Sequence, residues 1–129
     1  MASSVILDTS VFIASEQGRP LTRQLPSDVS VSVVTIAELE IGVLLAQDPE
    51  TRSHRLSTLT RVREQTAGLP ANDRVASAYA RLAASELAAG RRPRVQDTWI
   101  AATALVHGAE VWTQDADFSR FAAVDVVQV

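Results

Sequence analysis

Short strand-like runs separated by helix-like stretches are the feature that most constrains how this chain can fold. Residues 5–7, 110–113 and 124–129 are largely apolar and rich in β-branched side chains, and residues 29–34 alternate apolar with small polar side chains. Residues 67–70 are expected to be a break in the chain that can hold a very short additional strand. No tight hairpin signal joins these runs, so the strands are expected to pair in parallel. The sequence therefore predicts a three-layer α/β/α sandwich around a mostly parallel sheet of four to five strands.

Apolar residues recur at helical spacing between the strands. The expected helices cover residues 10–16, 36–47, 49–65, 73–89 and 95–107, with single helical turns at 21–25 and within 114–122. Asp8 and Thr35 are expected to cap the first two helices, because short oxygen-bearing side chains accept hydrogen bonds from the free amides at helix starts. The helix at 95–107 is apolar nearly all round and is therefore expected to be buried on two sides.

Length and composition narrow the function classes. The 129 residues are expected to form one domain, spanning 1–129. The absence of Cys excludes disulfides and thiolate metal sites, and the absence of Lys excludes P-loop and Schiff-base lysines. A net charge of −3 has the wrong sign for a protein that coats nucleic acid, so a nuclease of this composition needs local basic patches and a bound cation. No apolar run approaches the ~20 residues of a membrane span, and no basic residue precedes the first apolar run, so the cytoplasm is the expected location.

Four acids follow predicted strands or begin predicted helices. Asp8 directly follows the first strand, and Asp115 lies two residues beyond the strand at 110–113. Glu38 and Asp97 lie in the first turns of helices. Because ligands bind at the carboxyl ends of parallel strands, all four acids can reach one edge of the sheet. Crowded carboxylates repel one another, which favours a hard cation, Mg²⁺ or its substitute Mn²⁺, and points to hydrolysis of a phosphodiester.

Each acid also has an ordinary structural interpretation when it is taken alone. Asp8 can be a simple helix cap. Helical periodicity does not choose between Glu38 and Glu40. Loop position does not choose between Asp115 and Asp117, and Asp117 can instead cap the helical turn that follows it. It is the joint placement of the acids that favours a site.

Four segments resemble, in order and spacing, the motifs of PIN domains, and more narrowly those of the VapC-type toxins of bacterial toxin–antitoxin pairs. They are Ile6-Leu7-Asp8-Thr9-Ser10, Thr35-Ile36-Ala37-Glu38-Leu39 with Gly42, Asp97-Thr98-Trp99-Ile100-Ala101-Ala102, and Thr113-Gln114-Asp115 with Phe118. Each motif is weak alone, but four in this order over residues 5–127 are specific. The resemblance implies a PIN-like fold for the whole chain.

The resemblance also implies an active site and its chemistry, that of a Mg²⁺-dependent endoribonuclease. The implied catalytic acids are Asp8, Glu38, Asp97 and Asp115. From these acids we form the hypothesis that Asp8, Asp97 and Asp115 bind one or two Mg²⁺ ions, directly or through waters. In this hypothesis Glu38 positions a metal-bound water, and cleavage leaves a 5′-phosphate and a 3′-hydroxyl. The hydroxyls of Ser10 and Thr113 would hold the carboxylates in place, and Asp117 would be an auxiliary acid.

The same resemblance implies partners. The substrate would be a structured RNA such as tRNA, the protein would be a homodimer, and a cognate VapB-like antitoxin would wrap its helices and insert a tail into the site. Arg91, Arg92 and Arg94 form a basic connector just before the helix that carries Asp97. These arginines can hold the RNA backbone or can simply be solvated.

Two other classes of function compete with the nuclease. A non-catalytic interaction module could use the acidic pocket to bind a basic partner peptide. A phosphatase of the haloacid-dehalogenase type needs a second acid two residues after the first, but Ser10 occupies that position and no Lys is available. A metal titration and an RNA cleavage assay with and without EDTA separate the enzyme from the binding module.

Overall fold

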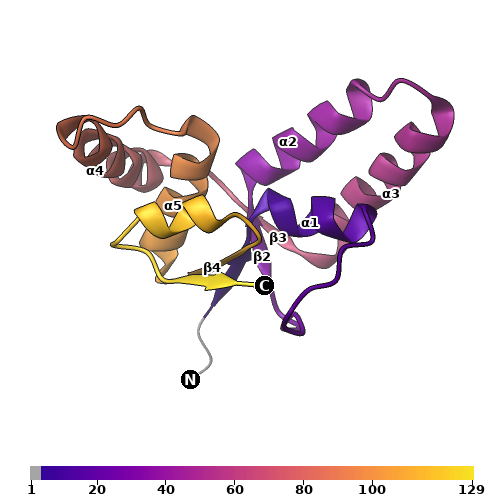
Figure 1. The fold of residues 1–129 in the computed structure, drawn as a ribbon, viewed down its shortest axis with the longest axis horizontal. Helices are drawn as coiled ribbons and strands as arrows, with labels where there is room; N and C mark the ends of the chain where they lie inside the picture. Colours follow the sequence, from indigo (N-terminus) through magenta and orange to yellow (C-terminus); the bar gives the residue numbers. More distant parts are fainter. Residues whose placement is uncertain (1–3) are drawn as a thin grey trace.

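Five strands form one sheet in the computed structural model, which describes residues 4–129 (Figure 1). The strands are β1 (Val5–Leu7), β2 (Ser30–Ser32), β3 (Ala67–Leu69), β4 (Glu110–Thr113) and β5 (Val126–Gln128). Their order across the sheet is β3-β2-β1-β4-β5, and every neighbouring pair is parallel. Ile6 of β1 lies in register with Ser30 on one side and Val111 on the other.

Helices cover both faces of the sheet, so the predicted three-layer α/β/α fold is confirmed (Figure 1). The helices are α1 (Thr9–Glu16), α2 (Val33–Leu44), α3 (Pro49–Gln65), α4 (Asp73–Ala88) and α5 (Val95–His107), with a 3₁₀ helix η1 (Ala116–Arg120). Successive strand residues point to opposite faces. Ile6 therefore packs in the core beneath α4 and α5, whereas Val5 and Leu7 pack in the core beneath α1, α2 and α3.

Helix α5 is buried on two sides, as its sequence predicts. Ile100 and Ala104 lie in the core against the sheet and have no exposed surface. On another side, Trp99 stacks on Tyr79 of α4 with the ring centroids 4.2 Å apart. The packing of α5 fixes the position of its first turn, which carries Asp97.

Two local predictions are wrong. Strand β2 ends at Ser32, and the Ser32 hydroxyl caps α2 by accepting a hydrogen bond from the Val34 amide at 3.1 Å. Thr35, predicted to be the cap, lies inside the helix and is fully buried. The helix starts earlier because the strand ends two residues earlier than predicted. Residues 21–25 form a loop in place of a helical turn, since the following Pro26 disfavours helical backbone in the residue before it.

The strand order places a reversal of the chain beside β1. The chain runs outward from β1 to β2 and β3, and later returns to β4 on the other side of β1. Because the strands are parallel, their carboxyl ends lie along one edge, and ligands bind such edges where the strand order reverses. Asp8 directly follows β1 and Gln114 directly follows β4, so these residues flank the reversal.

Two further expectations concern the ends of the chain and membranes. Residues 1–3, at which the sequence argues against a secretory signal, lie outside the described residues. Within residues 4–129, no helix combines the length and the apolar character that a membrane crossing requires.

Candidate active site

Asp8 is held at the sheet edge by two hydroxyl groups. Ser10 Oγ and Thr113 Oγ1 donate hydrogen bonds to Asp8 Oδ2 at 2.7 and 2.8 Å. Ser10 Oγ also accepts a hydrogen bond from the Gln114 amide at 3.0 Å, which ties α1 to the turn after β4. Asp8 is 4% exposed and occupies the N-cap position of α1, but its side chain makes no capping hydrogen bond. The prediction that Asp8 caps the helix is therefore wrong, because its carboxylate turns toward β4.

Glu38, rather than Glu40, faces this edge. Thr9 Oγ1 donates a hydrogen bond of 2.7 Å to Glu38 Oε1. Burial raises the pKa of Glu38 above its ordinary value, and the nearby Asp8 carboxylate adds to the shift, whereas the hydrogen bond from Thr9 opposes it. Glu40 is exposed and pairs with Arg63 at 3.4 Å. Glu40 therefore lies on the solvent side of α2.

Asp97 lies in the first turn of α5, close to the other acids. Burial raises its pKa from the ordinary value of 3.8 to about 6, and the ion pair with Arg94 opposes the shift. The charges of three neighbouring acids add to the rise, namely Asp8, Asp115 and Glu38. The acids predicted from sequence are thus close enough to repel one another across the sheet edge.

Asp115 and Asp117 have different roles at the start of η1. Asp115 Oδ1 accepts a hydrogen bond from the Asp117 amide at 2.9 Å, so Asp115 is the cap of η1. The interpretation of Asp117 as the cap is wrong. The Asp115 amide donates to Thr113 Oγ1 at 2.9 Å, which links this acid to the hydroxyls around Asp8. The Asp117 side chain is 74% exposed and lies at the outer rim.

Arg94 is in direct contact with the acids, a feature that the sequence analysis missed. Its guanidinium lies 3.1 Å from a carboxylate oxygen of Asp97 and 3.1 Å from one of Asp115. The separation of three residues between Arg94 and Asp97 on a helix start is the signal that could have indicated the first pair. Arg91 pairs with the buried Glu86. The interpretation of these two arginines as merely solvated is wrong.

The donor set suits a hard divalent cation, since carboxylate oxygens are the ligands that Mg²⁺ and Mn²⁺ prefer. Within residues 4–129, no three His, Cys, Asp or Glu side chains are placed to hold one metal ion without movement. In the same part of the structure, Arg94 is paired with Asp97 and Asp115, and Asp115 also caps η1. The residues therefore fit the cation in chemistry, although Arg94 is already paired with two of the carboxylates.

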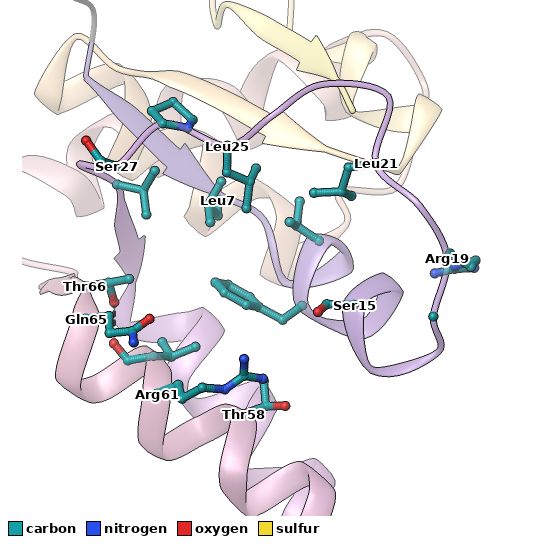
Figure 2. Close-up of a pocket in the computed structure, with 16 residues that line it drawn as sticks. Leu7, Ser15, Arg19, Leu21, Leu25, Ser27, Thr58, Arg61, Gln65 and Thr66 are labelled. Carbon is teal, nitrogen blue, oxygen red and sulfur yellow. Dashed lines mark hydrogen bonds between the residues drawn. The ribbon is translucent and has the colours of Figure 1, made fainter.

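A cavity of about 480 Å³ lies elsewhere, between α1, α3 and the loop that precedes β2 (Figure 2). Its walls are largely apolar, with Leu21 and Leu25 of the loop and Leu7 of β1 among them. None of the acids described above lines it. None of the residues that line this cavity is Asp, Glu or His, the usual metal ligands and general bases, so the acidic sheet edge is the better candidate for an active site.

Comparison with known proteins matches this arrangement of fold and acids. The PIN domain family model matches residues 5–124. Ribonuclease VapC5 of Mycobacterium tuberculosis is 44% identical over 96% of this chain and 94% of its own length, and Ribonuclease VapC4 of the same organism is 39% identical over 96% and 95%. A crystal structure of VapBC-5, a toxin–antitoxin system of M. tuberculosis, superposes with a TM-score of 0.85 at 39% identity, covering 99% of this chain and 100% of that one.

These matches cover nearly the whole chain, and they confirm the resemblance found in the four motifs. The chain belongs to the PIN domain family and, within it, to the VapC group.

Proposed function

We propose that this chain is a Mg²⁺-dependent endoribonuclease and the toxin of a toxin–antitoxin pair. The observation that carries the proposal is the convergence of four acids on one edge of the sheet, Asp8, Glu38, Asp97 and Asp115. The ribonuclease names of the relatives support RNA as the substrate. The VapBC complex among the similar structures supports an antitoxin as the partner.

In this proposal, Asp8, Asp97 and Asp115 hold the cation, either Mg²⁺ or Mn²⁺. When bound, the cation supplies Lewis-acid stabilisation of the charge that develops on the phosphoryl oxygens. Glu38 orients the attacking water and accepts its proton, for which its raised pKa is suited. The water oxygen forms a bond to phosphorus while the bond from phosphorus to the 3′-oxygen breaks. The departing 3′-oxygen takes a proton from solvent water, which leaves a 5′-phosphate and a 3′-hydroxyl. Ser10 and Thr113 keep the Asp8 carboxylate in place.

The protein partner is proposed to cover apolar side chains of the α2–α3 hairpin. Ile41, Leu44, Leu45 and Leu56 are each at least half exposed. An exposed group of large apolar side chains favours association with another protein. We propose that a VapB-like antitoxin occupies this surface and that the toxin itself is a homodimer acting in the cytoplasm.

Cleavage of purified RNA by the full-length protein tests the proposed activity. We expect cleavage with Mg²⁺, loss of cleavage with EDTA, and recovery when Mg²⁺ is added back. Asp8→Asn is expected to abolish cleavage without loss of fold, whereas Asp125→Asn, at an exposed position outside the site, is expected to cleave normally. Equal cleavage by Asp8→Asn and the wild-type protein would contradict the assignment. Sequencing of the RNA fragments after induced expression identifies the target.

The alternative function, a non-catalytic module that binds a basic peptide in the acidic pocket, makes a different prediction. Such a module binds its peptide equally well with EDTA and cleaves no RNA under any metal condition. The same assay therefore separates the two functions, provided that the antitoxin has been removed from the preparation.

A further inference from the structure

Arg94 joins three acids from different parts of the site. Its Nε, Nη2 and Nη1 atoms each lie 3.1 Å from an Oδ2 atom, of Asp97, Asp115 and Asp117 respectively. These acids belong to the first turn of α5, the turn after β4, and η1. The flat guanidinium offers several donors in one plane, which allows one side chain to make all three contacts.

The two oxygens of Asp115 are both engaged in these contacts. Oδ1 accepts the hydrogen bond from the Asp117 amide that caps η1, and Oδ2 pairs with Arg94. A cation bound at Oδ2 would lie beside the positive guanidinium and be repelled by it. The capping amide is part of the backbone of η1, whereas the Arg94 side chain is 41% exposed and can turn into water. Of the two partners of Asp115, Arg94 is therefore the one that can leave the carboxylate.

The same argument holds for Asp97, whose Oδ2 also pairs with Arg94. The exposed fraction of the acid side chains rises outward, from 18% at Asp97 through 30% at Asp115 to 74% at Asp117. A guanidinium that leaves the two inner acids thus still has an acid beside it at the rim. Its release exposes no unpaired charge in the protein interior.

We infer that Arg94 competes with a divalent cation for Asp97 and Asp115, so that a cation binding these carboxylates displaces the guanidinium. The inference rests on the proposed function and deepens it, because it gives one residue control over the cation concentration at which the site fills. The competition is reciprocal. The tighter Arg94 holds the two acids, the weaker the cation binds, and a bound cation in turn frees Arg94.

Mn²⁺ binding to the purified full-length protein at pH 7.5, measured by calorimetry and by electron paramagnetic resonance, tests the competition. Arg94→Gln is expected to lower the Kd for Mn²⁺ about tenfold, since it removes ion pairs that the cation otherwise has to break. Arg92→Gln is the matched control, because it deletes the same charge at an exposed position two residues away. We expect its Kd to stay within about twofold of wild type, since solvent screens that charge.

Two outcomes of the titration overturn the inference about Arg94 and leave the proposed function standing. Equal tightening by Arg94→Gln and Arg92→Gln would mean that only the overall charge matters. Unchanged or weaker binding by Arg94→Gln would mean that Arg94 assembles the acids for the cation rather than competing with it. If neither the wild-type protein nor Arg94→Gln binds Mn²⁺ at millimolar concentration, the proposed metal-dependent function itself fails, which is a distinguishable result.

A measurement on the wild-type protein keeps the inference testable even where Arg94→Gln does not fold. The ¹⁵N signal of the Arg94 Nε–H group is assigned by its absence from a spectrum of Arg94→Lys. Saturating Mg²⁺ is expected to move this signal and to speed its exchange with water, because the group loses its carboxylate partner. An Arg94 signal that stays unchanged while the site is filled overturns the competition.

Discussion

Asp97→Asn is expected to stabilise the protein at neutral pH in EDTA, although it removes an acid proposed to be catalytic. Burial and the neighbouring acids raise the pKa of Asp97 from 3.8 to about 6. Between these two pH values the folded protein binds more protons than the unfolded chain, so the free energy of unfolding falls as the pH rises. Above pH 6 the protein with Asp97 has lost all of this stability, and near pH 4 it has lost none. Asn resembles the protonated carboxyl, so the Asp97→Asn variant does not lose this stability as the pH rises.

The size of the effect follows from the shift. About two pKa units at 1.36 kcal/mol each give an upper limit of about 3 kcal/mol. The Asp97 side chain is 18% exposed, so solvent screening reduces the expected gain to the order of 2 kcal/mol at pH 7.5. Urea unfolding followed by Trp fluorescence between pH 4 and 8, in EDTA, measures it. Asp125→Asn is the matched control and is expected to change stability little at any pH.

The dependence on pH is what tests the reasoning. The gain in the free energy of unfolding is expected to grow from about zero at pH 4 to its full value above pH 6. A variant that is no more stable than wild type at pH 7.5 would refute the argument that Asp97 is held ionised against its surroundings. An equal gain at all pH values would point to better packing of Asn rather than to charge.

Three further predictions concern Ser10 and Glu38 of the candidate site and the buried Glu86. Ser10→Ala removes a hydroxyl that donates to Asp8, and it is expected to lower kcat for RNA cleavage about tenfold and stability by about 1 kcal/mol, with little change in KM. Glu38→Gln is expected to slow cleavage at least about 100-fold, because Glu38 is proposed to accept the proton of the attacking water. The Kd for Mn²⁺ is expected to stay within about threefold of wild type, because Glu38 is not proposed to bind the cation. A large loss of Mn²⁺ binding would show that Glu38 is a ligand instead. Glu86→Gln replaces a buried carboxylate that pairs with two arginines by a neutral amide. The variant is expected to lower the free energy of unfolding by about 1–3 kcal/mol, measured by thermal unfolding. Glu64→Gln, at an exposed position, is the control and is expected to change it little.

The sequence by itself determined the architecture and the edge at which the acids gather. Short β-branched runs separated by helical stretches, with no hairpin signal, favour parallel pairing, and parallel strands place their carboxyl ends together. Asp8, directly after a buried strand, was therefore expected at that edge. The fold prediction needed only local patterns, because strand and helix periodicities are properties of neighbouring residues.

The tertiary structure decided which acids face one another and what holds them. Glu38 and Glu40 are two residues apart, so they lie on nearly opposite sides of a helix, and the helical pattern alone favours neither. The choice depends on contacts between distant parts of the chain, such as the hydrogen bond from Thr9 to Glu38, 29 residues later. Arg94 likewise belongs to the acidic cluster only because the turn after β4 brings Asp115 to it. Hydrogen bonds and ion pairs across such sequence distances exist only once the sheet has formed, and the sequence pattern does not encode them locally.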